Sequence, residues 1–295
     1  MAGMFDYDVA FSRNVGWVTE AEQAALRRKR VAIAGMGGVG GAHLLTLVRL
    51  GIGSFNIADF DTFDVVNFNR QAGATMSSVG RLKVDVMAEL ARDINPDLGL
   101  EVSREPVSEE NLDAFLDGVD VYVDGLDFFA FDARRETFAA CARRGIPAVT
   151  AAPLGMGTAL LCFMPGSMSF EEYFRLDGCD ETEMALRFLL GLSPAMLQRG
   201  YLADSSRVRL ANRQGPSMVA ACQLCAGVTA VEVLKILLGR GRVLAAPWGY
   251  QFDAYRRRLV HTWRPGGNRN PIQRLGLAIA RRQFTGTRSA GVGDG

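Results

Sequence analysis

The residues with the clearest chemical meaning are a glycine cluster and an aspartate that follows it. The cluster reads Gly35-Met36-Gly37-Gly38-Val39-Gly40, and Asp59 comes nineteen residues after Gly40. Glycines let a turn approach phosphates closely, and a helix that begins there supplies N–H donors and the positive end of its dipole. A carboxylate at the end of the next strand can accept ribose hydroxyls. The pattern predicts a nucleotide site, although a dehydrogenase would show the same two features.

Further polar residues favour a triphosphate over a dinucleotide. They all follow Asp59 in the chain: Asp61, Asn67, Arg70, Lys83 and Asp127. Arginine and lysine neutralise phosphate charge, and an aspartate can hold Mg²⁺. Only three lysines occur against thirty arginines, so a lysine beside a motif is informative. An NAD-dependent enzyme gives these side chains no role.

The segments that must position these residues alternate between strands and helices. We expect strands at 31–34, 55–58, 119–123 and 148–151, and helices at 41–50, 79–94 and 138–144. This alternation predicts βαβ units and a parallel sheet over the first 150 residues. Ligands of such sheets bind beyond the carboxyl ends of the strands, where Asp59, Asp124 and Asp127 fall. Asp124 is either a ligand or a residue that forms the turn at the end of the strand.

The second half of the chain follows a different pattern. We expect a strand at 157–164, an irregular stretch at 167–216 with a helical patch near 183–190, a helix at 222–238, and paired strands at 250–253 and 258–262. The prediction is one domain over residues 1–265 with an insertion at 167–216. Residues 266–295 form a C-terminal extension, and the last ten are rich in glycine and expected to be disordered.

Taken together, the motifs resemble the ubiquitin-activating-enzyme superfamily in its bacterial form, typified by the adenylyltransferases ThiF and MoeB. The matching segments are Gly35–Gly40 for G-x-G-G-x-G, 59–61 for D-x-D, 67–71 for N-x-x-R-Q, Lys83, Asp127 and, near the N-terminus, 12–14. The resemblance implies an α/β fold with a Rossmann-like, mainly parallel sheet and helices on both faces. Antiparallel strands and a crossover insertion would continue that sheet.

The same resemblance implies an activity and a role for each matching residue. ATP and Mg²⁺ would adenylate a carboxylate, giving an acyl-adenylate and pyrophosphate. The catalytic residues would be Arg13, Arg70, Lys83 and Asp127, with Asp127 on Mg²⁺ and Arg13 acting in the partner's site of a homodimer. The nucleotide would be bound by Gly35, Gly37, Gly38, Gly40, Asp59, Asp61, Asn67, Arg70 and Lys83. The substrate would be a ubiquitin-like or sulfur-carrier protein, or a peptide, with a free C-terminal carboxylate.

Two other functions remain open at this point. An NAD-dependent oxidoreductase would account for the glycine loop and Asp59. A non-catalytic ThiF-like partner subunit would keep the fold without the chemistry. Composition limits the range of partners, because a net charge of +1 gives no sign of a nucleic-acid or membrane partner. Two histidines leave a Ser-His-Asp triad poorly supported, and five cysteines, an odd number, favour a reducing cytoplasm.

The cysteines raise a separate question about zinc and thioesters. The stretches 163–167 and 264–268, where relatives place zinc-binding C-x-x-C pairs, contain no cysteine, so no zinc site is expected. Cys222 and Cys225 form a C-x-x-C pair elsewhere, at the start of an apolar helix, and we expect them to pack as small residues. Cys179 is the cysteine within the insertion that could form a thioester. Its acidic neighbours would raise its thiol pKa, which is unfavourable for such a nucleophile.

Overall fold

An eight-stranded mixed sheet organises the computed structural model, which describes residues 4–209 and 213–289. The strands are β1 Arg30–Ala34, β2 Ser54–Ala58, β3 Gly99–Ser103, β4 Val121–Asp124, β5 Ala148–Leu154, β6 Gly157–Phe163, β7 Trp248–Asp253 and β8 Arg258–Trp263. They lie in the order β3-β2-β1-β4-β5-β6-β7-β8. Strands β1 to β5 pair in parallel and β6 to β8 continue antiparallel. The predicted fold class is confirmed.

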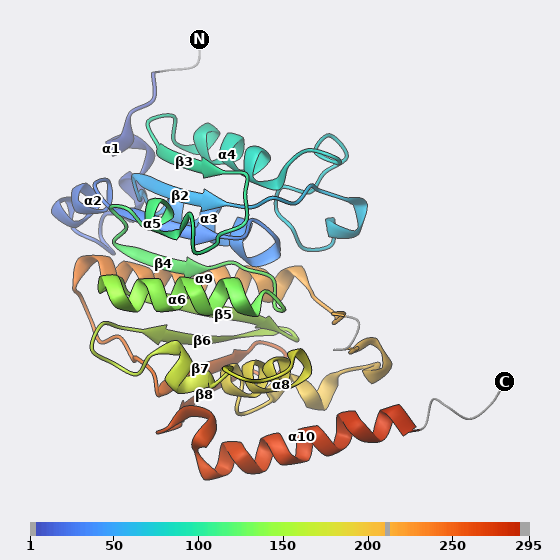
Figure 1. Cartoon of the computed structure of the whole chain (residues 1–295). Coiled ribbons are helices and arrows are strands. Elements are labelled where there is room, and N and C mark those ends of the chain that lie inside the picture. The colour runs from blue at the N-terminus through green and yellow to red at the C-terminus, as the bar shows by residue number, and fades with distance from the viewer. Residues whose placement is uncertain (1–3, 210–212, 290–295) are drawn as a thin grey trace.

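Helices cover both faces of this sheet (Figure 1). On one face α3 (Gly38–Arg49), α4 (Lys83–Ile94) and α9 (Val219–Leu238) pack on alternate strand residues such as Ile33 and Val123. The opposite face, which includes Tyr122, is covered by α5 (Leu112–Phe115), α6 (Phe131–Arg144), α7 (Phe170–Phe174) and α8 (Glu181–Leu192). Because successive strand residues point to opposite faces, each central strand contributes to both cores.

The structure departs from the predicted elements in several places. Strand β3 was not predicted; it forms one edge of the sheet and is only partly buried. Helix α4 begins at Lys83 and not at Val79, because Gly80 adopts φ +80° and donates its N–H to the carbonyl of Phe63. The insertion contains α7 as well as the expected helical patch, which is α8, and Ser169 and Glu172 form a capping box at the start of α7.

Helix α9 is long and apolar enough to cross a membrane by length and composition. In the fold it packs against α3, β5 and β6, and half of its most apolar window is buried. Its apolar composition is therefore explained by its place in the core. Two short α-helices, α1 (Tyr7–Ala10) and α2 (Glu20–Leu26), and the 3-10 helix Ser12–Asn14 between them precede β1.

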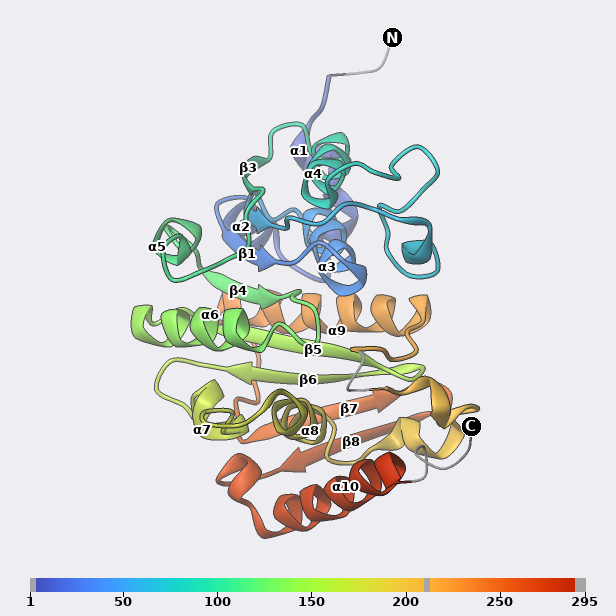
Figure 2. The same ribbon diagram turned by 45° about the vertical axis from the view of Figure 1, so that its right-hand side comes forward.

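The C-terminal extension contains a long helix, α10 (Pro271–Ser289), which lies beyond α8 (Figure 2). Leu277 is buried and packs with Leu186 and Leu190 of α8. Gln273 Nε2 donates to the carbonyl of Leu190 at 2.5 Å. Of the ten residues expected to be disordered, 286–289 belong to α10 and 290–295 lie outside the described residues.

Docking of α10 on α8 can be tested with two leucines of the same helix. Leu277 is 3% exposed, whereas Leu275 is 63% exposed. We expect Leu277→Ala to lower the free energy of unfolding by about 2–4 kcal/mol, because it removes buried methyl groups and leaves a cavity. Leu275→Ala, the control, should change it by less than about 0.5 kcal/mol. Denaturant titration followed by circular dichroism measures both, and equal effects would contradict the observed docking.

Candidate functional site

The glycine loop joins the end of β1 to the start of α3 through two positions that cannot hold a side chain. Gly35 adopts φ +89°, and a Cβ there would lie 2.2 Å from the carbonyl oxygen of Gly125, after β4. A Cβ on Gly40 would lie 1.8 Å from the carbonyl oxygen of Gly35. These glycines let the first turn of α3 pack directly on the ends of β1 and β4.

Gly37 and Gly38 have a different role, because they form the outer surface of the loop. Gly37 is the N-cap of α3, and a Cβ there would meet only Gln71 Nε2, at 3.8 Å. A Cβ on Gly38 would lie 3.2 Å from Cys222 Sγ and 3.3 Å from Arg70 Cγ. Arg70 and Gln71 therefore border the first turn of α3, and free N–H groups at a helix start beside an arginine suit a phosphate.

Asp59 fixes this loop to the end of β2. Its Oδ2 accepts a hydrogen bond from the N–H of Met36 at 2.6 Å, and its Oδ1 accepts one from the N–H of Asp61 at 2.8 Å. The residue is 9% exposed, and burial raises the pKa of its carboxyl against the opposing effect of these two donors and Lys83. Each carboxylate oxygen has a second lone pair, so a ribose hydroxyl can still be bound.

Lys83 lies at the first position of α4 and faces the same edge. Its Nζ is 3.0 Å from Asp61 Oδ2, and the Lys83 side chain is 9% exposed while that of Asp61 is 54% exposed. The N–H of Lys83 also donates to the carbonyl of Asp61. Asp61 thus orients Lys83, and a partner this exposed holds the cation weakly enough for a phosphate to compete.

Asn67 and Arg70 lie on the loop between β2 and α4. Asn67 is buried, and its Oδ1 accepts the N–H of Asp64 at 2.9 Å, closing the short helix Val65–Asn67. Arg70 Nη1 donates to Asn69 Oδ1 at 2.8 Å and to the carbonyl of Val66 at 3.3 Å. Among the residues that the structure describes, the guanidinium of Arg70 therefore bonds to its own loop, while its aliphatic Cγ and Cδ lie beside Gly38.

The two aspartates after β4 have separate roles. Asp124 is 4% exposed, pairs with Arg134 Nε at 2.8 Å and accepts the hydroxyl of Thr150 at 2.8 Å, so it is a structural residue. Asp127 is exposed, and its Oδ1 accepts the N–H of Phe129 at 3.0 Å. Magnesium commonly takes one or two carboxylates together with phosphate oxygens and water. The exposed carboxylate of Asp127 fits that requirement.

Arg13 is the one predicted catalytic residue that the fold places elsewhere. It is exposed in the short helix Ser12–Asn14, and Asn14 Nδ2 donates to the carbonyl of Arg49 at the last residue of α3. A helix of twelve residues is about 18 Å long. Figure 1 shows α1 and α2 at the amino ends of the parallel strands, opposite the glycine loop. Arg13 therefore cannot join the other residues within one protomer.

Two residues at this edge were not among the predicted site residues. Gln71 is 8% exposed, and its Oε1 has no hydrogen-bond partner in the described chain. It stands in the N-x-x-R-Q motif, which was the available signal. Cys222 contacts the loop at Gly38, and no sequence pattern indicated this because the two residues are joined only by the packing of α9 on α3.

The cysteines are poor candidates for chemistry. Cys222 and Cys225 are 1% and 0% exposed, and burial raises both thiol pKa values. The expected packing role is confirmed. Burial also raises the pKa of Cys179, with the carboxylates of Glu183, Glu171 and Asp180 adding to the rise and Arg187 opposing it. Within residues 4–209 and 213–289, no group of three or more His, Cys, Asp or Glu side chains could hold a metal ion.

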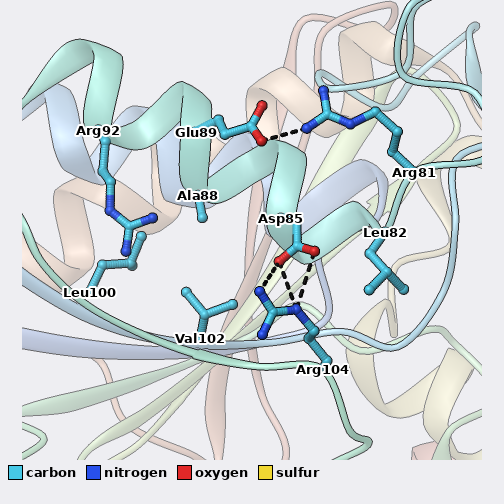
Figure 3. Close-up of a pocket in the computed structure, with 9 residues that line it drawn as sticks. All are labelled: Arg81, Leu82, Asp85, Ala88, Glu89, Arg92, Leu100, Val102 and Arg104. Carbon is cyan, nitrogen blue, oxygen red and sulfur yellow. Dashed lines mark hydrogen bonds and ion pairs between the residues drawn. The ribbon is translucent and has the colours of Figure 1, made fainter.

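A cavity of about 640 Å³ lies between α4 and the edge strand β3 (Figure 3). Leu82, Ala88, Leu100 and Val102 form its apolar wall. Asp85 pairs with Arg104, and Glu89 with Arg81, at its borders. None of the predicted site residues lines it. The cavity is thus separate from the glycine loop, although Leu82 directly precedes Lys83.

Comparison with known proteins decides the family. The sequence profile described as "ThiF family" matches residues 11–274, most of the chain. This protein belongs to the ThiF family. It is 33% identical over 141 residues to tRNA threonylcarbamoyladenosine dehydratase of Bacillus subtilis, covering 48% of this chain and 55% of the relative. It is 32% identical over 143 residues to the sulfur carrier protein ThiS adenylyltransferase of Escherichia coli, covering 48% and 56%.

The shared fold extends further than the shared sequence. A crystal structure of E. coli MccB with ATP superposes with a TM-score of 0.62 at 18% identity, covering 82% of this chain and 65% of MccB. The chain spans about half the length of the curated relatives it matches first. Membership of the ThiF family and the fold are therefore established.

The position of Asp59 predicts a pH dependence of nucleotide binding. Only the ionised carboxylate is a full acceptor for ribose hydroxyls, and burial raises its pKa above the ordinary 3.8. As the pH falls, the wild type should therefore begin to lose ATP affinity at a higher pH than it would if Asp59 were exposed. Asp59→Asn should bind ATP more weakly and lack this acidic loss. Titration calorimetry at a series of pH values measures the ATP affinity of both proteins. Protonation of the nucleotide weakens binding to both alike, so affinities that fall in parallel would contradict the role of Asp59.

Proposed function

We propose that this ThiF-family protein uses ATP and Mg²⁺ to adenylate a carboxylate. The observation that supports this most strongly is that Arg70 lies beside Gly38 of the glycine loop, while Lys83 pairs with Asp61, two residues after the Asp59 that bonds to the same loop. Two cations at that point suit a triphosphate and have no use in hydride transfer. An NAD-dependent reaction therefore accounts for the site less well.

The reaction would need positioning and charge stabilisation more than proton transfer. A carboxylate is already ionised at neutral pH, so no general base is required. Its oxygen would form a bond to the α-phosphorus as the bond to the leaving pyrophosphate breaks. Asp59 would hold the ribose, and the N–H groups at Gly37 and Gly38 would bind the phosphates together with Asn67, Arg70 and Lys83. Asp127 would hold Mg²⁺, which offsets charge on the phosphates.

The acyl substrate is proposed from the relatives' chemistry. We infer a protein or peptide with a free C-terminal carboxylate, because one relative is named for a sulfur carrier protein and MccB has been solved with MccA. A second class is a carboxylate on tRNA, since the first relatives are named for threonylcarbamoyladenosine, which contains a carboxylate. We also propose that the protein is cytoplasmic and acts as a homodimer.

ATP–pyrophosphate exchange tests the reaction and identifies the substrate. The purified protein would be supplied with small carrier proteins ending in Gly-Gly, with peptides, or with tRNA. We expect exchange that depends on one of these classes and falls about a hundredfold or more in Arg70→Ala, which loses a donor to the developing charge. Arg81→Ala, whose side chain pairs with Glu89 outside the site, is the control. Exchange that survives in Arg70→Ala would rule out this assignment.

A subunit-mixing experiment tests the role proposed for Arg13. Arg13→Ala and Lys83→Ala should each be nearly inactive alone. If Arg13 acts in the partner's site, mixed dimers contain one intact site, and random mixing of equal amounts restores about a quarter of wild-type exchange. Exchange by the mixture that stays at the level of the single variants would show that Arg13 does not act across a dimer.

A further inference from the structure

Arg134 of α6 is a fully buried cation that uses all of its hydrogen-bond donors. The residue is 2% exposed. Its Nε donates to Asp124 Oδ2 at 2.8 Å. The four remaining N–H groups meet backbone carbonyls of one loop, those of Leu126 and Asp127 at 2.9 Å, of Phe128 at 3.2 Å and of Ala130 at 3.5 Å. A guanidinium has five donors, and here each has an acceptor.

The loop held in this way is the one that presents Asp127. Residues 125–130 curve around the guanidinium, with Asp124 bonded to Arg134 at their start and the carbonyl of Ala130 at their end. Within the loop the N–H of Phe129 donates to Asp127 Oδ1, which sets the direction of the carboxylate. The carbonyl of Asp127 itself bonds to Arg134. The orientation of Asp127 therefore depends on the shape that Arg134 imposes.

Arg134 also contacts the insertion. The ring of Phe188 on α8 lies 4.6 Å from the guanidinium carbon, measured to the ring centroid. Phe128, directly after Asp127, packs on the same ring with centroids 5.3 Å apart. Phe188 is 2% exposed. One aromatic side chain of the insertion thus touches both the buried cation and the loop that carries Asp127.

Lysine cannot reproduce this arrangement. An ammonium group has three donors on a flexible stem, whereas the planar guanidinium spans Asp124 and four carbonyls at once. A buried carbonyl left without a donor loses its hydrogen bond without regaining water. Replacing Arg134 by lysine should therefore keep the charge beside Asp124 and release the loop.

We propose that Arg134 is a positioning residue that presents Asp127 to magnesium, and that Phe188 couples this arrangement to the insertion. The proposal rests on the proposed function for the identity of the metal and the nucleotide. The hold of Arg134 on residues 125–130 concerns the free protein and can be tested without either.

The test compares Arg134→Lys and Phe188→Leu with Arg135→Lys, the neighbouring arginine of α6, which pairs with Glu171 and Asp177 and not with the loop. Titration calorimetry would measure ATP affinity without Mg²⁺ and the Mg²⁺ concentration that gives half of the metal-dependent gain. Hydrogen–deuterium exchange of the free proteins would report the amides of residues 125–130.

We expect Arg134→Lys to raise the half-saturating Mg²⁺ concentration about tenfold or more, the usual effect of losing a residue that supports a ligand. Phe188→Leu should raise this concentration about threefold, and this variant provides the test if Arg134→Lys does not fold. ATP affinity without Mg²⁺ should stay within about twofold, and exchange should quicken in residues 125–130. Arg135→Lys should match the wild type.

Two results would overturn the proposal. The first is a folded variant whose half-saturating Mg²⁺ concentration is unchanged. A variant whose ATP affinity falls as much without Mg²⁺ as with it would count in the same way, because it would mean a general structural role. The second is unchanged exchange of residues 125–130 in both variants. If the wild type binds no ATP with or without Mg²⁺, the proposed function fails instead, and the exchange measurement still decides whether Arg134 orders the loop.

Discussion

The backbones of Gly35, Gly40 and Gly125 meet where β1, β4 and α3 converge, and the whole site depends on that contact. A Cβ on Gly125 would lie 2.6 Å from the carbonyl oxygen of Gly35 and 2.8 Å from Gly40 Cα. Any side chain at these positions would push α3 away from the sheet. The N–H groups at the start of α3 would then lose their alignment with Asp59, which bonds to Met36 in the same loop.

The charged side chains at the carboxyl ends of the parallel strands have partners that bind them with unequal strength. Asp124 and Arg134 are both fully buried and bonded to each other, so this pair fixes structure. Lys83 is buried but pairs with the exposed Asp61, and Arg70 bonds to its own loop within the described part of the chain. Arg70, whose stem lies beside Gly38, and Lys83, beside Asp61, therefore have weaker partners than Arg134, which supports the loop after β4. A phosphate can displace such partners at modest cost.

The central βαβ units could be predicted because their strands are buried on both faces and form continuous apolar runs. The glycine loop, Asp59 and Asp127 followed from their places at the ends of these strands. Edge strand β3 escaped prediction, because Leu100 and Val102 alternate with polar residues and are only partly buried. Helix α10 was missed because its residues are rich in arginine and glycine, and Leu277 is buried only through contact with α8.

Contacts between distant segments account for the rest of what the sequence could not predict. Phe128, directly after Asp127, packs on Phe188 of the insertion, and no local pattern indicates a contact between residues so far apart in the chain. The five bonds of Arg134 depend on the path of a loop that no motif describes. Arg13 lies at the far end of α3, so its proposed role depends on a second copy of the chain.

The most direct test of the central claim is a calorimetric titration of the purified protein with ATP and Mg²⁺, and separately with NAD⁺ and NADH. The account predicts saturable binding of ATP that Mg²⁺ strengthens, with no binding of either dinucleotide. Binding of NADH together with failure to bind ATP would contradict it and would make the glycine loop and Asp59 a dinucleotide site.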